Sequence, residues 1–443
     1  MSERGAGVRE AGTHDKDQIA AELELVRARS LRLCDELSEE NQQRQHSPLM
    51  SPLVWDLAHV GNYEELWLQR ALGGPPAIDE TLDDLYDAFR NPRQDRPALQ
   101  LHGPAEAREY ISRVRATVLD VLDGVEVGPG DDPLLSDGFV YGMVVQHEHQ
   151  HDETMLATRQ LMGERATPPA GTVAAPRPAD PLEPGEVRVD GGTFVMGTSA
   201  EPWAYDNERP AHEVTLDPFW IDVAPVTNGQ YLEFMADGGY DERRWWSDDG
   251  WAWRSENRPE APLFWEGTGE GWTVLRYGAR QALDAAEPVQ HVCWYEADAF
   301  ARWAGRRLPT EAEWEMAASW DPAGSKRRYP WGQEAGDGAP ANLGQRHAGP
   351  VAVGAHPEGV SPWGCHQMIG DVWEWTASDF RPYPGFEAFP YSEYSEVFWG
   401  PDYKVLRGGS WATHPLAVRT TFRNWDHPIR RQIFAGFRCA RDE

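Results

Sequence analysis

Cysteine is scarce in this sequence, and its copies stand far apart. Cys34, Cys293, Cys365 and Cys439 form no CxxC pair, which argues against a zinc ribbon and against a disulfide-dense secreted scaffold. Long apolar runs are missing as well. The N-terminal segment MSERGAGVREAGTHDKDQ has no apolar core of a signal peptide, and no later stretch approaches the length of a membrane span. We therefore expect a cytoplasmic protein.

Positive charge is the second scarcity. Lys and Arg total 41 against 72 Asp and Glu, which gives a formal net charge of -31. Such an excess of negative charge repels phosphate backbones and anionic lipid headgroups. We expect neither nucleic acid nor a membrane among the partners of this chain, and we expect a monomer.

Tryptophan is nearly absent from the first part of the chain. Of 21 tryptophans only Trp55 and Trp67 precede residue 170, and the length of 443 residues suggests more than one domain. Residues 164–187, between the tryptophan-poor first part and the rest of the chain, are rich in proline, a composition that resists helix and sheet. We predict a helical domain at 1–163, a linker at 164–187 and a second domain at 188–443.

Apolar residues recur at helical spacing in the first domain. The stripe Leu23, Val26, Leu33 and Leu37 predicts a first helix, and the same periodicity is found near 52–72, 105–122 and 139–162. Four such helices predict a four-helix bundle.

The second domain has a different pattern. Short alternating or β-branched runs are separated by Gly, Pro and Asp turns, with helical stretches at 296–305 and 310–318. The predicted fold class is therefore multidomain, with an α domain followed by an α+β domain.

The run HEHQH contains a histidine pair at helical spacing. His147 and His151 are four residues apart, so they project from one face of a helix, whereas His149 is rotated away from them. His59, on the second predicted helix, offers a third imidazole. Histidines from two facing helices can hold one metal ion. The spacing does not choose between iron and zinc, since three neutral imidazoles also suit a catalytic zinc ion.

Two other interpretations of this run stay open. A histidine pair on an apolar face is often a hydrogen-bonded part of the core. The run also fits the metallopeptidase signature HExxH, in which Glu148 would be the general base, although the longer form HExxHxxGxxH is absent.

Six motifs together carry a resemblance to one family. They are SPLVWDLAHVGNYEELWL, FxxxMVxxHEHQHDETM, RLPTEAEWEMAA, GDVWEWTAS, VLRGGSWA and FRNWDHPIRRQIFAGFRCA. In this order they resemble the EgtB family, the sulfoxide synthases of ergothioneine biosynthesis, over almost the whole chain. The resemblance implies a DinB-like four-helix bundle followed by a formylglycine-generating-enzyme-like domain, which is a variant of the C-type-lectin fold.

The resemblance also implies an activity. Enzymes of this family use Fe(II) and O2 to join the sulfur of γ-glutamylcysteine to C2 of hercynine, the Nα-trimethylated histidine, as a sulfoxide. The iron ligands would be His59, His147 and His151. Cysteine as sulfur donor, an ovothiol-type 5-histidylcysteine sulfoxide synthase and a selenoneine synthase remain alternatives. Formylglycine generation fits poorly, because it relies on two reactive cysteines near the chain end, where only Cys439 lies.

An island of arginines follows the second helix. Arg93 and Arg96 resemble the pair that grips the carboxylates of γ-glutamylcysteine, a task that suits the planar guanidinium. Arg90 belongs to the same island. The alternative is structural, with these arginines capping a loop against Asp84 or Asp95.

Other substrate contacts are implied by the same resemblance. Gln150, Asn424 and Trp425 would contact hercynine, with the indole attracting the quaternary ammonium. Asp426 would meet the amino group of γ-glutamylcysteine, and Arg430 lies in the same substrate-binding motif.

A tyrosine is expected to donate the catalytic proton. The loop PYPGFEAFPYSEY offers Tyr383, Tyr391 and Tyr394. We favour Tyr391 as the donor, with Tyr394 as a neighbouring contact.

Overall fold

A computed structural model of the chain describes residues 15–163, 166, 168–178, 180–269, 271–336 and 338–443. The segment 1–14, which carries most of the signal-peptide prediction, and residues 164, 165, 167 and 179 of the predicted linker lie outside the described residues. The chain forms two compact units. Unit 1 comprises Met1–Asp152 and Ala200–Ala204, and unit 2 comprises Glu153–Ser199 and Tyr205–Glu443.

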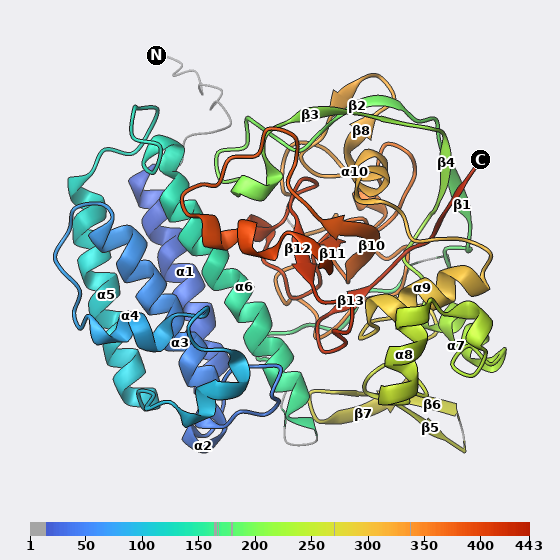
Figure 1. Ribbon diagram of the computed structural model, residues 1–443, viewed down its shortest axis with the longest axis horizontal. Helices are drawn as coiled ribbons and strands as arrows, with labels where there is room; N and C mark the ends of the chain where they lie inside the picture. Colours follow the sequence, from blue (N-terminus) through green and yellow to red (C-terminus); the bar gives the residue numbers. More distant parts are fainter. Residues whose placement is uncertain (1–14, 164–165, 167, 179, 270, 337) are drawn as a thin grey trace, which may run out of the picture. The chain divides into compact units, whose positions relative to one another are not determined.

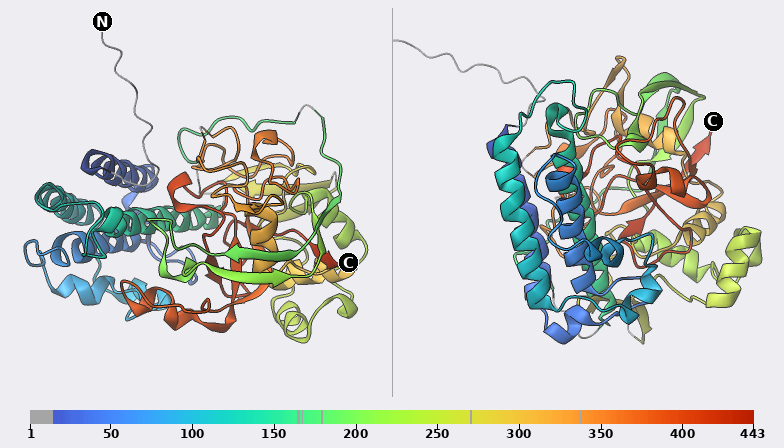
Figure 2. Two further views of the ribbon diagram at one scale, coloured as in Figure 1. Left: turned by 90° about the horizontal axis from the view of Figure 1, so that it is seen from above. Right: turned by 60° about the vertical axis from the view of Figure 1, so that its left-hand side comes forward.

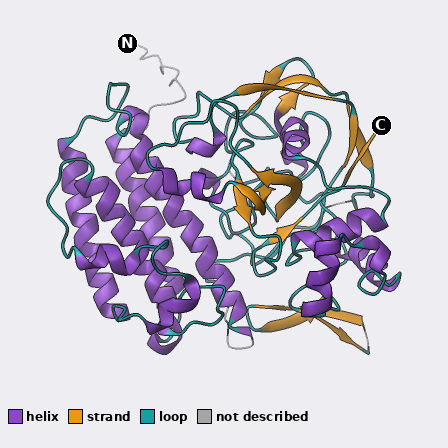
Figure 3. Ribbon diagram, in the orientation of Figure 1, coloured by secondary structure: helices purple, strands orange, loops and turns teal. Residues whose placement is uncertain are grey.

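Unit 1 is helical (Figures 1 and 3). Its helices are α1 (Lys16–Asp35), α2 (Glu39–Gln43), α3 (Leu53–Glu64), α4 (Thr81–Tyr86), α5 (Pro104–Gly124) and α6 (Phe139–Leu161). A π-helical turn at Glu65–Arg70 extends α3, and α6 continues into unit 2 after Asp152. The four helices predicted from apolar periodicity are confirmed.

Local sequence explains where these helices begin and how they pack. Asp15 caps α1 by accepting the Gln18 backbone N–H at 2.9 Å. Gly61 of α3 faces Ile111 of α5, where a Cβ atom would lie only 2.4 Å from Cγ2 of that isoleucine. Glycine therefore lets α3 and α5 approach closely.

Unit 2 consists of short strands and helices joined by long loops (Figures 2 and 3). One antiparallel sheet has the order β1 (Glu186–Val189), β4 (Phe219–Asp222), β14 (Ala440–Asp442). A second has the order β12 (Asn424–Asp426), β11 (Gly400–Arg407), β10 (Trp373–Phe380), β13 (Ala435–Gly436), with β10 and β13 parallel. The described residues from 166 to 185 lie in no helix or strand, and β1 begins at Glu186, just inside the predicted linker.

Smaller elements complete unit 2. The remaining strands are β2 (Gly192–Met196), β3 (His212–Leu216), β5 (Trp265–Thr268), β6 (Gly271–Arg276), β7 (Ala279–Ala282), β8 (Trp320–Asp321) and β9 (Ser325–Lys326). The helices are α7 (Asn228–Ala236), α8 (Asp248–Asn257), α9 (Trp294–Trp303) and α10 (Glu311–Ser319). The predicted helical stretches correspond to α9 and α10, so the fold class of α followed by α+β is confirmed.

The core of unit 2 brings together strands from the beginning and the end of its sequence. β4 pairs with β1 on one side and with β14 on the other. Trp314 of α10 is completely buried in a cluster with Phe219, Ile221 and Ala440. No helix in the described part of the chain is long and apolar enough to cross a membrane.

Candidate metal centre

Three histidines from two helices meet in unit 1. His59 of α3 and His147 and His151 of α6 each offer a nitrogen, and these atoms lie within 4.8 Å of one another. The ring centroids of His59 are 5.2 Å from His147 and 4.7 Å from His151, and the latter two are 4.6 Å apart. One metal ion can contact three nitrogens in such a cluster.

Two of the imidazoles are oriented by hydrogen bonds. His59 Nδ1 lies 2.7 Å from the carbonyl oxygen of Tyr86, which can only accept. His151 Nδ1 lies 3.2 Å from Oδ1 of Asp56. Donation from Nδ1 in both cases leaves the Nε2 lone pair for a metal ion, an arrangement common around metal-binding histidines.

The third imidazole is held by stacking. The ring of His147 lies 3.8 Å from that of Tyr63, with 19° between their planes. Its Nδ1 is buried and has no hydrogen-bond partner among the described residues. A buried nitrogen without a partner is costly, so a cation that bound this Nδ1 would remove that cost.

Burial also sets the protonation of two members of the cluster. Burial lowers the pKa of His59 and of His147 well below the usual value, and repulsion from the neighbouring His151 lowers both further. Imidazoles in this state are neutral near pH 7, and the neutral form is the one that coordinates a metal ion. The three residues therefore fit a metal ion.

The opposite side of α6 is occupied by a buried ion-pair network. Glu148 accepts hydrogen bonds from Arg27 Nε at 2.8 Å and from Ser30 Oγ at 2.7 Å. Burial would raise the pKa of Glu148, but Arg27 and Arg115 outweigh it and lower this pKa. Glu148 is thus fixed against α1, and the metallopeptidase alternative loses its general base.

The same network ties the helices that carry the histidines. Arg27 of α1 also contacts Glu64 of α3, and Arg115 of α5 donates from Nε to Glu64 at 2.6 Å. His149 faces this side as well, beside Arg29 at 3.4 Å. The prediction that His149 points away from the histidine cluster is confirmed.

The predicted arginines have different surroundings. Arg96 is buried, with 4% exposure, and its guanidinium lies 3.4 Å from the ring centroid of Trp55. Arg93 is half-buried and donates to the carbonyl of Leu49 at 3.2 Å. Arg90 is exposed and forms ion pairs with Asp84 and Asp87. Of these three arginines, Arg96 alone has a buried guanidinium, which is the least common environment for this side chain.

The predicted residues of unit 2 lie on or near β12. Trp425 stacks on Phe380, with 4.1 Å between centroids and 10° between planes. Asp426 accepts from Arg430 Nε at 3.2 Å. Asn424 uses its side-chain oxygen to accept the Trp425 backbone N–H at 2.9 Å. Gln150 lies in unit 1, half-buried on α6.

The loop with the predicted tyrosines is anchored inside unit 2. Tyr394 stacks on Tyr205 at 4.3 Å and lies 6.2 Å from Tyr391. Asp206 accepts from Ser395 Oγ and from the Phe389 backbone N–H at 3.3 Å. Burial raises the pKa of Asp206 to about 6.

Tyr383 has a different setting. It is buried, lies 4.1 Å beneath the guanidinium of Arg423, and its hydroxyl is 3.4 Å from Glu311. These contacts place Tyr383 in a structural network.

Sequence reasoning missed several supporting residues. Trp55 was noted only as one of the two tryptophans before residue 170, and the contact of Asp56 with His151 was not predicted. An acidic residue three positions before His59, on a helix face that is otherwise apolar, is the signal that could have drawn attention to Asp56. Asp206 offered no comparable signal, because its partners are far away in the sequence.

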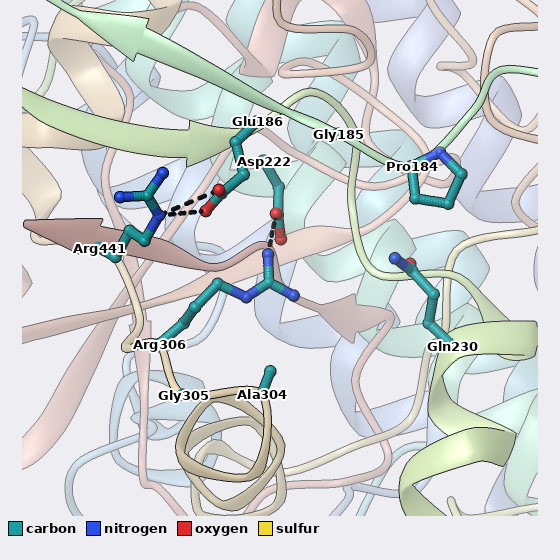
Figure 4. A pocket seen from close by; sticks show the side chains of 9 residues that line it. All are labelled: Pro184, Gly185, Glu186, Asp222, Gln230, Ala304, Gly305, Arg306 and Arg441. Carbon is teal, nitrogen blue, oxygen red and sulfur yellow. Dashed lines mark hydrogen bonds and ion pairs between the residues drawn. The ribbon is translucent and has the colours of Figure 1, made fainter.

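A polar cavity in unit 2 is lined by none of the predicted residues (Figure 4). Its charges are paired, since Arg306 contacts Asp222 and Arg441 lies 3.0 Å from Glu186.

All four cysteines are buried, and none of them forms a disulfide. Burial raises the pKa of the Cys34 thiol to about 12 and that of Cys365 to about 11, and it raises the pKa values of Cys293 and Cys439 well above the usual value. Such thiols are poor nucleophiles at neutral pH. Cys439 therefore does not support formylglycine generation.

Comparisons with known proteins cover almost the whole chain. Residues 22–155 match the DinB superfamily, and residues 172–443 match the sulfatase-modifying factor enzyme 1-like domain. A hercynine oxygenase of Mycolicibacterium smegmatis is 50% identical over 441 residues, covering 96% of this chain and 99% of that protein. One of Mycobacterium tuberculosis is 50% identical over 433 residues, with the same coverage. A formylglycine-generating enzyme of Streptomyces coelicolor is 34% identical over 314 residues, covering 61% of this chain and 96% of that protein.

Proposed function

Because the chain belongs to the hercynine oxygenase family, we propose that it is an Fe(II)-dependent sulfoxide synthase. It joins the sulfur of γ-glutamylcysteine to C2 of the hercynine imidazole, with O2 as the oxidant. The observation that carries this proposal is the cluster of His59, His147 and His151 in unit 1.

The three histidines would hold the iron as neutral ligands. Asp56 and the Tyr86 carbonyl accept from Nδ1 of His151 and His59, so that the other nitrogen of each ring would be available to the metal ion. Bound Fe(II) supplies coordination sites at which substrates and O2 can react. The supporting feature in this chain is that the ligand set contains no carboxylate, which leaves the site more positive and favours a thiolate.

Substrate binding is assigned to the residues that match the family motifs. Arg93 and Arg96 would bind the carboxylates of γ-glutamylcysteine, and the burial of Arg96 beside neutral partners supports this role. Gln150, Asn424 and Trp425 would bind hercynine. Asp426, with Arg430 beside it, would bind the amino group of the thiol substrate. Tyr391 would donate a proton.

The test is reconstitution of the purified protein with Fe(II) under anaerobic conditions, followed by exposure to air with hercynine and γ-glutamylcysteine. Mass spectrometry should find the sulfoxide conjugate. Its absence from a protein that binds iron would contradict the proposal.

Parallel reactions separate the alternatives. Free cysteine in place of γ-glutamylcysteine tests the sulfur donor, and histidine in place of hercynine tests the ovothiol-type reaction. A zinc-loaded sample should form no conjugate, since zinc has no redox chemistry. His147→Ala should lose both iron binding and product formation.

A further inference from the structure

Trp55 is a shared neighbour of a predicted metal ligand and a predicted substrate residue. Its indole is nearly parallel to the ring of His59, with 4.7 Å between centroids and 12° between planes. The guanidinium of Arg96 lies 3.4 Å from the Trp55 ring centroid. All three residues belong to unit 1, so a single completely buried indole connects them.

The C-terminal end of α4 fixes this arrangement. The carbonyl of Leu85 accepts from Trp55 Nε1 at 3.3 Å, and the next carbonyl, of Tyr86, accepts from His59 Nδ1 at 2.7 Å. Asn91 donates to the Leu85 carbonyl at 3.1 Å, and its own carbonyl accepts from Arg96 Nε at 2.9 Å. The indole, the imidazole and the guanidinium are therefore held by one short segment of chain.

Arg96 forms no hydrogen bond to a charged group among the described residues, and the Asp56 carboxylate, which favours its charge from a distance, accepts from His151 instead. The hydrogen-bond partners of Arg96 are the Ser51 hydroxyl and the Asn91 carbonyl, both neutral. A buried cation with neutral partners is costly and is stabilised when an anion binds. The same positive charge, one indole away from His59, opposes a metal cation at that histidine.

We propose that Trp55 is a positioning residue that couples the anion site at Arg96 to the metal site at His59. A carboxylate bound to Arg96 and a metal ion bound to the three histidines then raise each other's affinity. The carboxylate neutralises Arg96 and fixes it against the indole, which in turn fixes the plane of the His59 ring. This inference rests on the proposed function, because it takes the carboxylate from the thiol substrate.

The test uses γ-glutamylalanine, which has the carboxylates of γ-glutamylcysteine and no thiol to bind the metal directly. The dissociation constant of Fe(II) is measured anaerobically on the full-length apoprotein, without and with saturating γ-glutamylalanine. We expect the analogue to lower this constant at least about fivefold, at the lower end of typical coupling between sites. Linkage requires iron to tighten analogue binding by the same factor.

Variants identify the path of the coupling. Trp55→Leu should lower this factor clearly below that of the wild type, leaving only the part that comes from neutralising the Arg96 charge. Tyr63→Leu is the matched control, because Tyr63 stacks on His147, a different member of the histidine cluster. It should change iron affinity and keep the coupling. Arg96→Gln should bind iron a few-fold more tightly without analogue, because a repelling charge is gone; a merely structural arginine would not give this sign.

Several outcomes would overturn the inference. The first is an iron dissociation constant that γ-glutamylalanine does not change in the wild type. The second is a coupling factor in Trp55→Leu equal to that of the wild type. The third is a loss of coupling in Tyr63→Leu as large as that in Trp55→Leu. If Trp55→Leu does not fold, Trp55→Phe serves instead, and a factor equal to that of the wild type counts against the role of the indole. Product formation by the same wild-type preparation is measured in parallel. Sulfoxide without coupling refutes only this inference, whereas absence of sulfoxide refutes the proposed function.

Discussion

Asp56 on α3 accepts a hydrogen bond from His151 on α6, with 3.2 Å between Oδ1 and Nδ1. The carboxylate of Asp56 thus orients His151, a candidate metal ligand on α6, from the helix that carries His59, another candidate ligand. Asp56→Ala should raise the iron dissociation constant about 10-fold to 100-fold, the usual effect of removing such a partner. Metal titration under anaerobic conditions measures it.

Asp120, exposed on α5, provides a charge-matched control. Asp120→Asn should leave iron affinity within about twofold, since net charge alone has a small effect at physiological salt. Equal effects of the two substitutions would mean that Asp56 acts only through its charge.

Glu148→Gln should affect stability and leave the chemistry of the folded protein intact. The change removes one of the two carboxylate partners of buried Arg27, whose other partner is Glu64, and breaking this buried ion pair costs up to roughly 3 kcal/mol. Chemical denaturation should show this loss, while the turnover number per folded molecule stays near that of the wild type.

The matched control is Glu24→Gln. Glu24 is exposed and lies 3.8 Å from Arg115 of the same network, so its loss should cost less than about 1 kcal/mol. Loss of turnover without loss of stability in Glu148→Gln would instead revive a general-base role.

Arg93→Ala should selectively weaken binding of the thiol substrate. Hydrogen bonds between charged groups contribute about 1.5–3 kcal/mol, so the KM for γ-glutamylcysteine should rise about tenfold or more. The KM for hercynine should stay within about twofold. Arg90→Ala is the control, because Arg90 is engaged in exposed ion pairs with Asp84 and Asp87. Similar increases for both substrates in Arg93→Ala would contradict the assignment.

Tyr391→Phe keeps the ring and removes the hydroxyl. If Tyr391 is the proton donor, the variant should divert turnover from sulfoxide formation toward oxidation of the thiol substrate alone. Mass spectrometry of the products, together with oxygen consumption, gives the ratio. Tyr394→Phe, whose ring stacks on Tyr205, should change this ratio less. An unchanged ratio in Tyr391→Phe would remove it as the donor.

The Asp206 carboxyl should make stability depend on pH. Its folded-state pKa of about 6 exceeds the ordinary value of about 4. The raised pKa means that the folded state holds the proton more tightly, so this stabilisation is complete below about pH 4 and is lost as pH rises through 6. The free energy of unfolding of the wild type, relative to Asp206→Asn, should fall by roughly 2 kcal/mol between pH 4 and 7. A constant difference across this range would contradict the shift.

The sequence predicted the elements that depend on local periodicity. Apolar stripes located α1, α3, α5 and α6, and the spacing of His147 and His151 placed both imidazoles on one face of α6. A helix repeats every 3.6 residues, so these inferences need no knowledge of the rest of the chain.

The contacts that orient the site could not be found in this way. The Tyr86 carbonyl reaches His59 only because the end of α4 folds back on α3, and a backbone oxygen leaves no trace in the residue pattern. Asp206 meets Ser395 across a sequence separation of 189 residues. The setting of Arg90 also follows from tertiary structure, because the same loop could have turned this side chain inward as it does Arg96.

The buried cysteines have a practical consequence for measuring this chemistry. A protein that handles a thiol substrate and oxygen together would lose material to mixed disulfides if its own thiols were exposed. Cys34, Cys293, Cys365 and Cys439 are all enclosed and have raised pKa values. Alkylating reagents should therefore label only the denatured chain. Colorimetric counting of free thiols in a reaction mixture of native protein then reports the substrate alone.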